Sequence, residues 1–175
     1  MNFELKGTPK ELGYYFPAEF AKHTATWLSW PHKDASWPGK IDSIFPSYTL
    51  FIKELTAGEL VRINVRDETM KTFAVKHLQN AGVDLSRVEF FFHPTNDAWC
   101  RDHGPAFLIN PSAEQKKVIV DWNYNAWGNK YADHERDAAV AEEVLKHLAM
   151  RRYAAPIVVE GGAIHTDGEG TLLTT

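Results

Sequence analysis

The sequence predicts a mixed α/β fold in which helices recur between short groups of strands. Apolar and polar residues alternate in short runs, as at Val61, Ile63 and Val65, and a period of two is typical of a half-buried strand. Longer segments, such as residues 135–150, instead place apolar side chains at helical spacing. A helix followed by two or three strands occurs more than once, which indicates structural repetition without visible sequence repeats.

The strands are expected where short apolar runs are bounded by turn residues. They cover residues 24–30, 61–65, 88–93, 105–110, 117–122 and 157–159, followed by a hairpin over 163–175 with a Gly-rich turn. Pro31 should end the first strand, and Pro156 should open the short buried strand before Glu160.

Three helices are expected between these strands. They run over residues 46–57, from Asp67 to Gly82, and over 135–150. Pro46 suits the first turn of its helix, and Gly58 suits the end. Asp67 and Asp133 can cap the helices that follow them. Residues 123–131 are read as a polar aromatic loop.

Size and composition limit the function classes. The 175 residues suffice for one domain or a large part of one, and we expect a single domain over residues 1–175. The net charge of −4 argues against nucleic-acid binding and favours cationic ligands. No apolar segment suggests a membrane span or a signal peptide. One cysteine excludes an internal disulfide, so we expect a reduced cytoplasmic location.

The segment 96–105, NDAWCRDHGP, is the most informative stretch of the sequence. It places many ionisable groups between two expected strands, where unpaired charge would be costly. If the segment stays extended, Asp97, Trp99 and Arg101 face one way and Cys100 faces the other. A carboxylate beside an indole suits a planar cation, which can be bound at its edge and stacked on its face. The structural alternative is an Asp–Arg pair that closes a turn.

Asp97 and Glu160 each follow an expected strand, where open α/β sheets place their ligand sites. Two glycines after Glu160 would permit close approach of backbone or substrate. A Glu that satisfies turn amides is the alternative for that position. A second candidate site is Cys100 as a nucleophile with His103 as its base, although a lone cysteine is commonly a small hydrophobe.

A metal site is the third candidate. Its ligands would come from His93, Asp97, His103, His165 and Asp167. The His165–Asp167 spacing places both side chains on one strand face, yet the DGEG segment is ordinary hairpin-turn chemistry. No paired CxxC or HExxH motif is present, so we assign no metal ligands.

Five motifs in order carry a family resemblance: FPAEF, TWLSWP, NDAWCRDHGP, WNYNAWGNKY and VVEGGAIHTDGEGTLLTT. Together they resemble the agmatine deiminase and bacterial-type peptidylarginine deiminase family, a branch of the guanidino-group-modifying enzymes, over residues 14–175. The resemblance implies repeated αββαβ modules of a five-bladed pentein propeller, incomplete in this chain. It also implies hydrolysis of a guanidinium with release of ammonia and without a cofactor, as in the conversion of agmatine to N-carbamoylputrescine or of peptidyl-arginine to citrulline.

In such enzymes a cysteine thiolate attacks the guanidinium carbon and water resolves the adduct, while a histidine transfers protons. By resemblance, Asp97 matches the guanidinium-binding aspartate of the D-x-W-x-R-D motif. Glu160 matches the glutamate of E-G-G, which binds the guanidinium and supports catalysis. Trp99 matches the motif tryptophan, for which we infer stacking on the substrate. Arg101 and Asp102 are expected to pair and shape the loop.

The chain departs from the family pattern in two respects. The catalytic histidine, in a G-H-x-D motif, and the nucleophilic cysteine both come later in family members. Neither His165 nor Cys100 matches them, so we expect an N-terminal part of a longer enzyme that is inactive alone. A non-catalytic cation-binding fragment is the alternative, with a metal-dependent hydrolase third. The expected partner is a small cationic guanidino substrate; agmatine versus peptidyl-arginine, and homo-oligomer formation, stay open.

Overall fold

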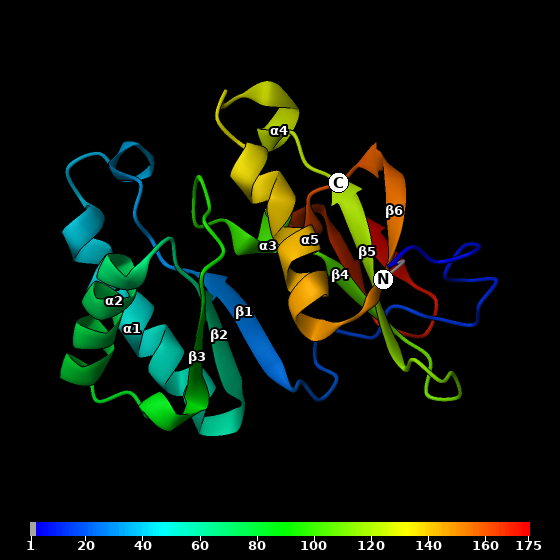
Figure 1. The fold of residues 1–175 in the computed structure, drawn as a ribbon, viewed down its shortest axis with the longest axis horizontal. Helices are drawn as coiled ribbons and strands as arrows, with labels where there is room; N and C mark the ends of the chain where they lie inside the picture. The colour runs from blue at the N-terminus through cyan, green and yellow to red at the C-terminus, as the bar shows by residue number, and fades with distance from the viewer. Residues whose placement is uncertain (1–2) are drawn as a thin grey trace. The chain divides into compact units, whose positions relative to one another are not determined.

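The computed structural model describes residues 3–175. The chain divides into two compact units. We call Lys22–Cys100 the parallel-sheet unit, and residues 3–21 together with Arg101–Thr175 the mixed-sheet unit. Each unit combines strands with helices (Figure 1), so the predicted mixed α/β class is confirmed. That the two form one domain over residues 1–175 stays a prediction.

The parallel-sheet unit is a β-α-β-α-β arrangement. Its strands β1 (Ala25–Ser29), β2 (Leu60–Asn64) and β3 (Val88–Phe91) pair in the order β1-β2-β3, all parallel. Helices α1 (Ile41–Gly58) and α2 (Glu68–Asn80) make the two crossovers and lie on the same side of the strands (Figure 1). Parallel strands require such crossovers, and consequently all three carboxyl ends lie at one edge.

A single apolar core holds this unit together. Its buried members are Trp30, Phe45, Ile52, Val61, Ile63, Val65, Met70, Ala74, Leu78 and Val83. Alternation along β2 places Val61 and Ile63 inward, as the pattern predicted. The predicted cap of α2 is confirmed, because the Asp67 carboxylate accepts a hydrogen bond from the backbone N–H of Met70 at 2.8 Å.

Helix α1 begins five residues before the predicted start. Pro46 lies inside it, rather than at its first position. A proline near the N-terminus of a helix removes only one backbone donor, and the buried Phe45 and Ile52 side chains anchor the helix on both sides of it. The end is confirmed, since Gly58 is the last helical residue.

The mixed-sheet unit contains a three-stranded sheet and a hairpin. Its strands are β4 (Ala106–Ile109), β5 (Lys117–Asn123), β6 (Arg151–Val158), β7 (Ile164–Thr166) and β8 (Leu172–Thr174). Strand β5 is central, antiparallel to β4 and parallel to β6. The hairpin β7–β8 is antiparallel, as predicted. Helix α5 (Glu135–Leu148) connects β5 to β6 and buries an apolar face that includes Val144 and Leu145.

The predicted cap of α5 is wrong by one residue. His134, not Asp133, precedes the first helical turn. The His134 side chain makes no capping hydrogen bond, and its backbone N–H donates to the Glu135 carboxylate at 3.2 Å. The acidic side chains of the first turn, Glu135 and Asp137, also suit the positive end of the helix dipole.

The buried strand predicted at 157–159 is also wrong. Strand β6 begins at Arg151 and contains Pro156, while Ile157 and Val158 are 54% and 47% exposed. The register shifts between Trp122 and Asn123 of β5, so Pro156 falls within an irregularity of the ladder, where its missing N–H leaves no regular bond unmade.

The expected loop over 123–131 contains a short helical turn, α4 (Ala126–Asn129). Ala126, Trp127 and Asn129 have positive φ angles there, and left-handed backbone at non-glycine residues is uncommon. The Asn125 side chain accepts from the backbone N–H of Gly128 at 2.9 Å and stabilises the turn. Across residues 3–175, no helix has both the length and the apolar composition that a membrane span requires.

Candidate functional site

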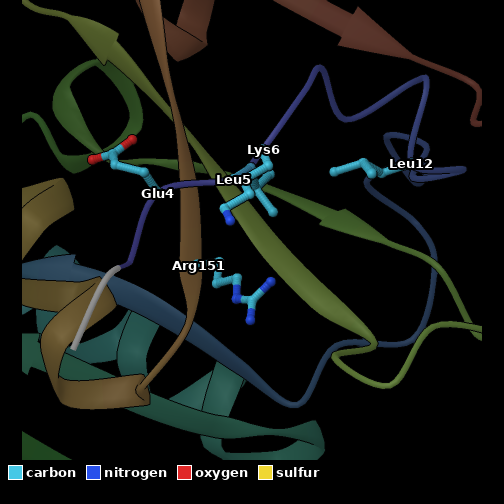
Figure 2. Close-up of a pocket in the computed structure, with 5 residues that line it drawn as sticks. All are labelled: Glu4, Leu5, Lys6, Leu12 and Arg151. Carbon is cyan, nitrogen blue, oxygen red and sulfur yellow. The ribbon is translucent and has the colours of Figure 1, made fainter.

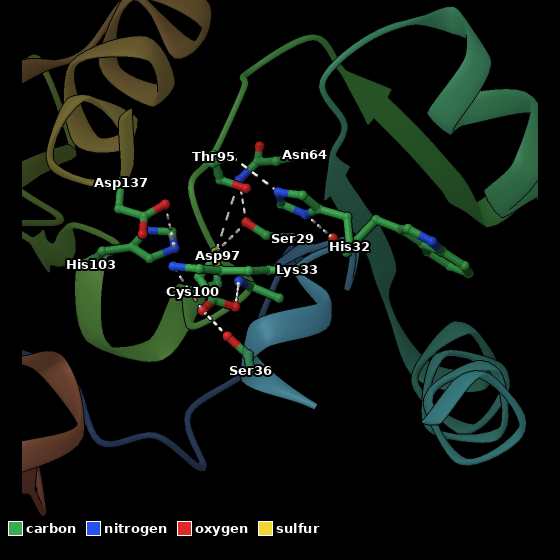
Figure 3. A network of polar contacts seen from close by, with 12 residues as sticks. Ser29, His32, Lys33, Ser36, Asn64, Thr95, Asp97, Cys100, His103 and Asp137 are labelled. Carbon is green, nitrogen blue, oxygen red and sulfur yellow. Dashed lines mark hydrogen bonds and ion pairs between the residues drawn. The ribbon is translucent and has the colours of Figure 1, made fainter. Parts of the chain in front are cut away.

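Buried polar side chains join the carboxyl ends of the three parallel strands (Figure 3). Asn64 ends β2 and donates from Nδ2 to Ser29 Oγ, at the end of β1, over 3.2 Å. Its Oδ1 lies 3.1 Å from Nδ1 of His93, which follows β3. Because buried polar groups are costly without partners, this network holds the three strand ends in a defined arrangement.

His32 links the loop after β1 to the loop after β3. One ring nitrogen lies 2.9 Å from the Trp30 carbonyl and the other 3.1 Å from the Thr95 carbonyl (Figure 3). His32 thereby fixes the backbone of both loops immediately before the segment that contains Asp97.

The Asp97 carboxylate is buried, with the residue only 6% exposed. Its Oδ1 accepts a hydrogen bond from the backbone N–H of Ala98 at 2.8 Å. Its Oδ2 accepts from the hydroxyl of Ser36, and Lys33 Nζ lies 3.8 Å away (Figure 3). Residues 33–36, in the loop after β1, therefore supply both a hydroxyl and a cation to the carboxylate that follows β3.

Two indole rings lie on the same pair of loops. The ring centroids of Trp37 and Trp99 are 5.5 Å apart with a 35° tilt. Trp99 is 39% exposed, so part of its surface is open to a ligand. Trp99 follows Asp97 by two residues, and Trp37 directly follows Ser36. A buried carboxylate beside aromatic rings can bind a planar cation: the carboxylate accepts hydrogen bonds from the edge of the cation, and a ring stacks on its face.

The central motif does not stay extended, which was the condition for the alternation considered in the sequence. Residues 96–98 bend, and Cys100–His103 form one helical turn, α3. The Cys100 N–H donates to the Ala98 carbonyl at 2.8 Å, while Asp97 binds the Ala98 N–H. These local bonds replace the strand ladder, so alternation does not describe where Asp97, Trp99 and Cys100 point.

Cys100 is half-buried and contacts polar groups of the strand ends. The Ser29 hydroxyl donates to its Sγ over 3.6 Å, and Asn64 Nδ2 lies 3.9 Å from it. Nearby, Tyr48 donates to the Ser29 carbonyl at 2.8 Å. Burial, with a smaller effect of Cys100, raises the pKa of the Tyr48 phenol far above its ordinary value, so it remains a donor. The predicted base, His103, is buried in the mixed-sheet unit, 3.9 Å from an Asp137 oxygen.

Glu160 follows β6 in the mixed-sheet unit, directly before the turn Gly161–Ala163. Both glycines of this turn pack against α3. A Cβ on Gly161 would collide with the Arg101 carbonyl oxygen, and a Cβ on Gly162 would collide with the Asp102 carboxylate. The pair of glycines after Glu160 is therefore required for close backbone approach, as the sequence indicated.

Asp102 binds the turn that follows Glu160. Its carboxylate accepts a hydrogen bond from the Gly162 backbone N–H, which lowers its pKa, but burial raises the pKa more strongly. The negative charge of Glu160 raises the pKa of Asp102 further, and the positive charge of Arg101 lowers it. Glu160 is thus close enough to Asp102 to influence its titration.

The Arg101 guanidinium ion-pairs with Glu19, and not with Asp102 as expected. It also donates to the Ile164 carbonyl at 3.4 Å. The other Glu19 oxygen lies 3.2 Å from Nδ1 of His165. The hydrogen bond from Arg101 is the main reason that the pKa of Glu19 is lowered. Arg101 therefore ties the N-terminal segment to the hairpin.

The candidate metal ligands are divided between the two units. His93 and Asp97 belong to the parallel-sheet unit, and His103, His165 and Asp167 to the mixed-sheet unit. Asp167 caps the hairpin turn, accepting from the backbone N–H groups of residues 169 and 171 at 2.8 and 3.0 Å. From residue 3 onward, no three His, Cys, Asp or Glu side chains form a group that could hold a metal ion.

A pocket of about 420 Å³ lies elsewhere in the mixed-sheet unit (Figure 2). It is lined by Glu4, Leu5, Lys6, Leu12 and Arg151. None of the predicted site residues lines it. Its position beside β6 and the N-terminal segment gives it no part in the arrangement around Asp97 or Glu160.

The sequence did not single out Lys33, Ser36 or Trp37 as site residues. A usable signal was present, since parallel strands bring the loops that follow them to one edge. The loops after β1 and β3 were therefore candidates to meet, although the sequence does not specify which side chains would touch.

Known proteins resemble this chain along nearly its whole length. The family model for Porphyromonas-type peptidyl-arginine deiminase matches residues 15–175. A candidate agmatine deiminase of Yersinia pseudotuberculosis is 39% identical, with 98% of this chain and 46% of the relative aligned. Agmatine deiminase of Stutzerimonas stutzeri is 37% identical, at the same two coverages.

A solved structure of agmatine deiminase from Enterococcus faecalis superposes with a TM-score of 0.86. The identity is 27%, and the match covers 99% of this chain and 47% of that one. The chain spans about half the length of the curated relatives it matches. The motif match, the curated relatives and the shared fold agree, and the chain belongs to the Porphyromonas-type peptidyl-arginine deiminase family.

Proposed function

We propose that the protein containing this chain hydrolyses the guanidinium group of a small cationic substrate, releasing ammonia and leaving a ureido group. Family membership supports this reaction class, and the relatives named as agmatine deiminases favour agmatine over peptidyl-arginine. The observation that carries the proposal is the buried Asp97 carboxylate, fixed by Ser36 and by the Ala98 N–H in the loop that also contains Trp99.

Asp97, Glu160 and Trp99 are the proposed substrate-binding residues. Asp97 would accept two N–H bonds from the guanidinium, a geometry that favours guanidinium over other cations. Glu160 would bind the same group and support catalysis. Trp99 would stack on the cation, which is consistent with its partly exposed ring.

In the proposed mechanism, a cysteine thiolate attacks the guanidinium carbon and forms a tetrahedral adduct. A histidine donates the proton that lets the C–N bond break, so ammonia leaves and an S-alkylthiouronium remains. Water then adds to the same carbon, the C–S bond breaks, and the ureido product and thiolate are released. We assign the nucleophile to a cysteine outside this chain, because Cys100 belongs to the aspartate motif.

We also propose that the strand and helix groups of both units are modules of a five-bladed propeller. The repetition of a helix with two or three strands supports this architecture. The exposed strand ends Ile157, Leu172 and Leu173 are apolar surfaces of the kind that neighbouring modules cover.

The test is an ammonia-release assay with agmatine, arginine and a blocked arginine peptide. We expect the complete gene product to release ammonia from agmatine at the highest kcat/KM, and the 175-residue chain to release none. Agmatine binding without ammonia release by the complete product would instead identify a non-catalytic cation-binding protein. If the complete product neither bound agmatine nor released ammonia from it, both functions would be excluded.

A further inference from the structure

We propose that Asn64 is a positioning residue: its buried side chain fastens both ends of the loop 93–100, which presents Asp97 to the substrate cation. This inference rests on the proposed function, since it assumes that the loop receives the guanidinium. Asn64 lies outside the five motifs and ends β2, the central strand of the parallel sheet.

Asn64 contacts the first and the last residue of this loop. Its Oδ1 lies 3.1 Å from Nδ1 of His93, and its Nδ2 lies 3.9 Å from Sγ of Cys100. The same Nδ2 donates to the Ser29 hydroxyl over 3.2 Å, and that hydroxyl donates to the Cys100 sulfur over 3.6 Å (Figure 3). Direct and relayed contacts therefore run from one amide to both ends of the loop.

A side-chain amide suits this position because it offers an acceptor and a donor in one rigid group. The oxygen can only accept, so Nδ1 of His93 carries the proton and donates to it, while the nitrogen donates towards Ser29 and Cys100. A leucine of similar size would fill the same volume and make none of these bonds. Packing alone does not require the amide, and the contacts that it makes with the loop account for it.

The role of Asn64 is exerted through the loop. With 1% of its surface exposed, Asn64 offers no surface to a ligand. Other contacts also restrain the loop, among them those of His32 and Ser36, and these act before Trp99. Asn64 acts in addition at Cys100, directly after Trp99, and so contributes to where the partly exposed indole is placed.

Loosening the loop should lower affinity by a change in population. A ligand that binds only a fraction of the molecules has an apparent Kd raised by the inverse of that fraction. Each polar contact shifts a local equilibrium by about fivefold, and Asn64→Leu removes those with His93, Ser29 and Cys100 together. The conformation that binds the cation should then become a minority.

Two measurements on Asn64→Leu test this in the complete gene product. Hydrogen exchange, followed by mass spectrometry, reports the opening of peptides within residues 93–100, and calorimetry reports the Kd for n-butylguanidinium. The control is Val61→Ala, because Val61 is fully buried near the start of the same strand. This control should destabilise the core away from the loop, and thermal melting gives the loss of stability of each variant.

In Asn64→Leu, exchange in the loop should rise about tenfold more than exchange in α1 and α2, whose rise reports the global loss of stability. The Kd should rise about fivefold. Val61→Ala should raise exchange no more in the loop than in the helices and should leave the Kd within about twofold of the wild type. The inference is overturned by an unchanged Kd in folded Asn64→Leu, by a raised Kd without the extra loop exchange, or by an equal rise in Kd in Val61→Ala.

Two further variants complete the design. Ser29→Ala removes only the relayed contact and should still raise loop exchange above that of the helices; no such rise overturns the inference even if Asn64→Leu does not fold. Asp97→Asn tests the underlying proposal separately. If Asp97→Asn does not weaken butylguanidinium binding, the proposed site is wrong and the inference falls with it. If it does and Asn64→Leu binds like the wild type, only the role of Asn64 is wrong.

Discussion

The Asp102 carboxylate accepts a hydrogen bond from the backbone N–H of Gly162, and this contact joins two motifs that lie far apart along the chain. Asp102 ends the D-x-W-x-R-D motif, and Gly162 ends the E-G-G motif. The Gly161 backbone packs against the Arg101 carbonyl at the same place. The position of Glu160 within the mixed-sheet unit therefore depends on residues of the aspartate motif.

Gly161→Ala should destabilise the fold. The added methyl group would overlap the Arg101 carbonyl oxygen, and backbone on both sides must shift to admit it. We expect a loss of about 2 kcal/mol in the free energy of unfolding, measured in denaturant. Gly58→Ala is the matched control, because nothing lies within 4 Å of its Cβ position at the end of α1. Equal stability of the two variants would show that the close packing of Gly161 is not required.

Asp102→Asn should change how stability depends on pH. Burial raises the pKa of Asp102 above its ordinary value of 3.8, so the folded state holds the proton more tightly than the unfolded state. That contribution is fully present below the unfolded pKa and is lost as pH rises through the folded pKa. We expect the wild type to lose stability relative to Asp102→Asn across this acidic window. If the free energies of unfolding of the two proteins changed with pH in the same way between pH 3 and pH 7, the assignment would be contradicted.

Replacing Trp99 should weaken cation binding without unfolding the protein, since the ring is partly exposed. Trp99→Ala removes the proposed stacking face, and we expect a five- to tenfold increase in the Kd for butylguanidinium, or about 1 kcal/mol. Trp99→Phe keeps an aromatic face and should retain most of the affinity. The stacking role would be refuted by an alanine variant that binds as tightly as the wild type.

Cys100→Ser should leave ammonia release by the complete gene product nearly unchanged. The thiol contacts Ser29 and Asn64, and a serine hydroxyl can make both contacts. Circular dichroism would verify the fold before kcat/KM is compared. A folded Cys100→Ser protein without activity would show that the nucleophile has been assigned to the wrong cysteine.

The parallel-sheet unit was largely predictable because its signals are local. The alternation in β2, the Asp67 cap and the glycine at the end of α1 act within a few residues of the elements they define. The start of α1 and the form of β6 were not, because prolines within these elements are tolerated only where the surrounding core or an irregular ladder accommodates them. Amino-acid composition and hydrophobic periodicity do not contain that tertiary information.

The candidate site shows the same division. Asp97 and Glu160 were predicted from residue type, motif and position after a strand, and their roles stay predictions. The bend between Asp97 and Cys100 was not predicted; there Asp97 binds the next backbone N–H, a local contact that competes with the extended conformation. Lys33 and Ser36 were missed because their partner lies some sixty residues away, and only the pairing of β1, β2 and β3 brings the two loops to one edge.

The central proposal is that Asp97 and Glu160 bind one guanidinium, and a double-mutant cycle on agmatine binding tests it most directly. Asp97→Asn and Glu160→Gln should each raise Kd about 30-fold, since each removes a charge-assisted hydrogen bond. If both carboxylates hold the same group, the double variant should lose clearly less than the product of the two effects, with a coupling of about 1 kcal/mol. Strictly additive losses, or a Glu160→Gln variant that binds agmatine like the wild type, would contradict a shared guanidinium site.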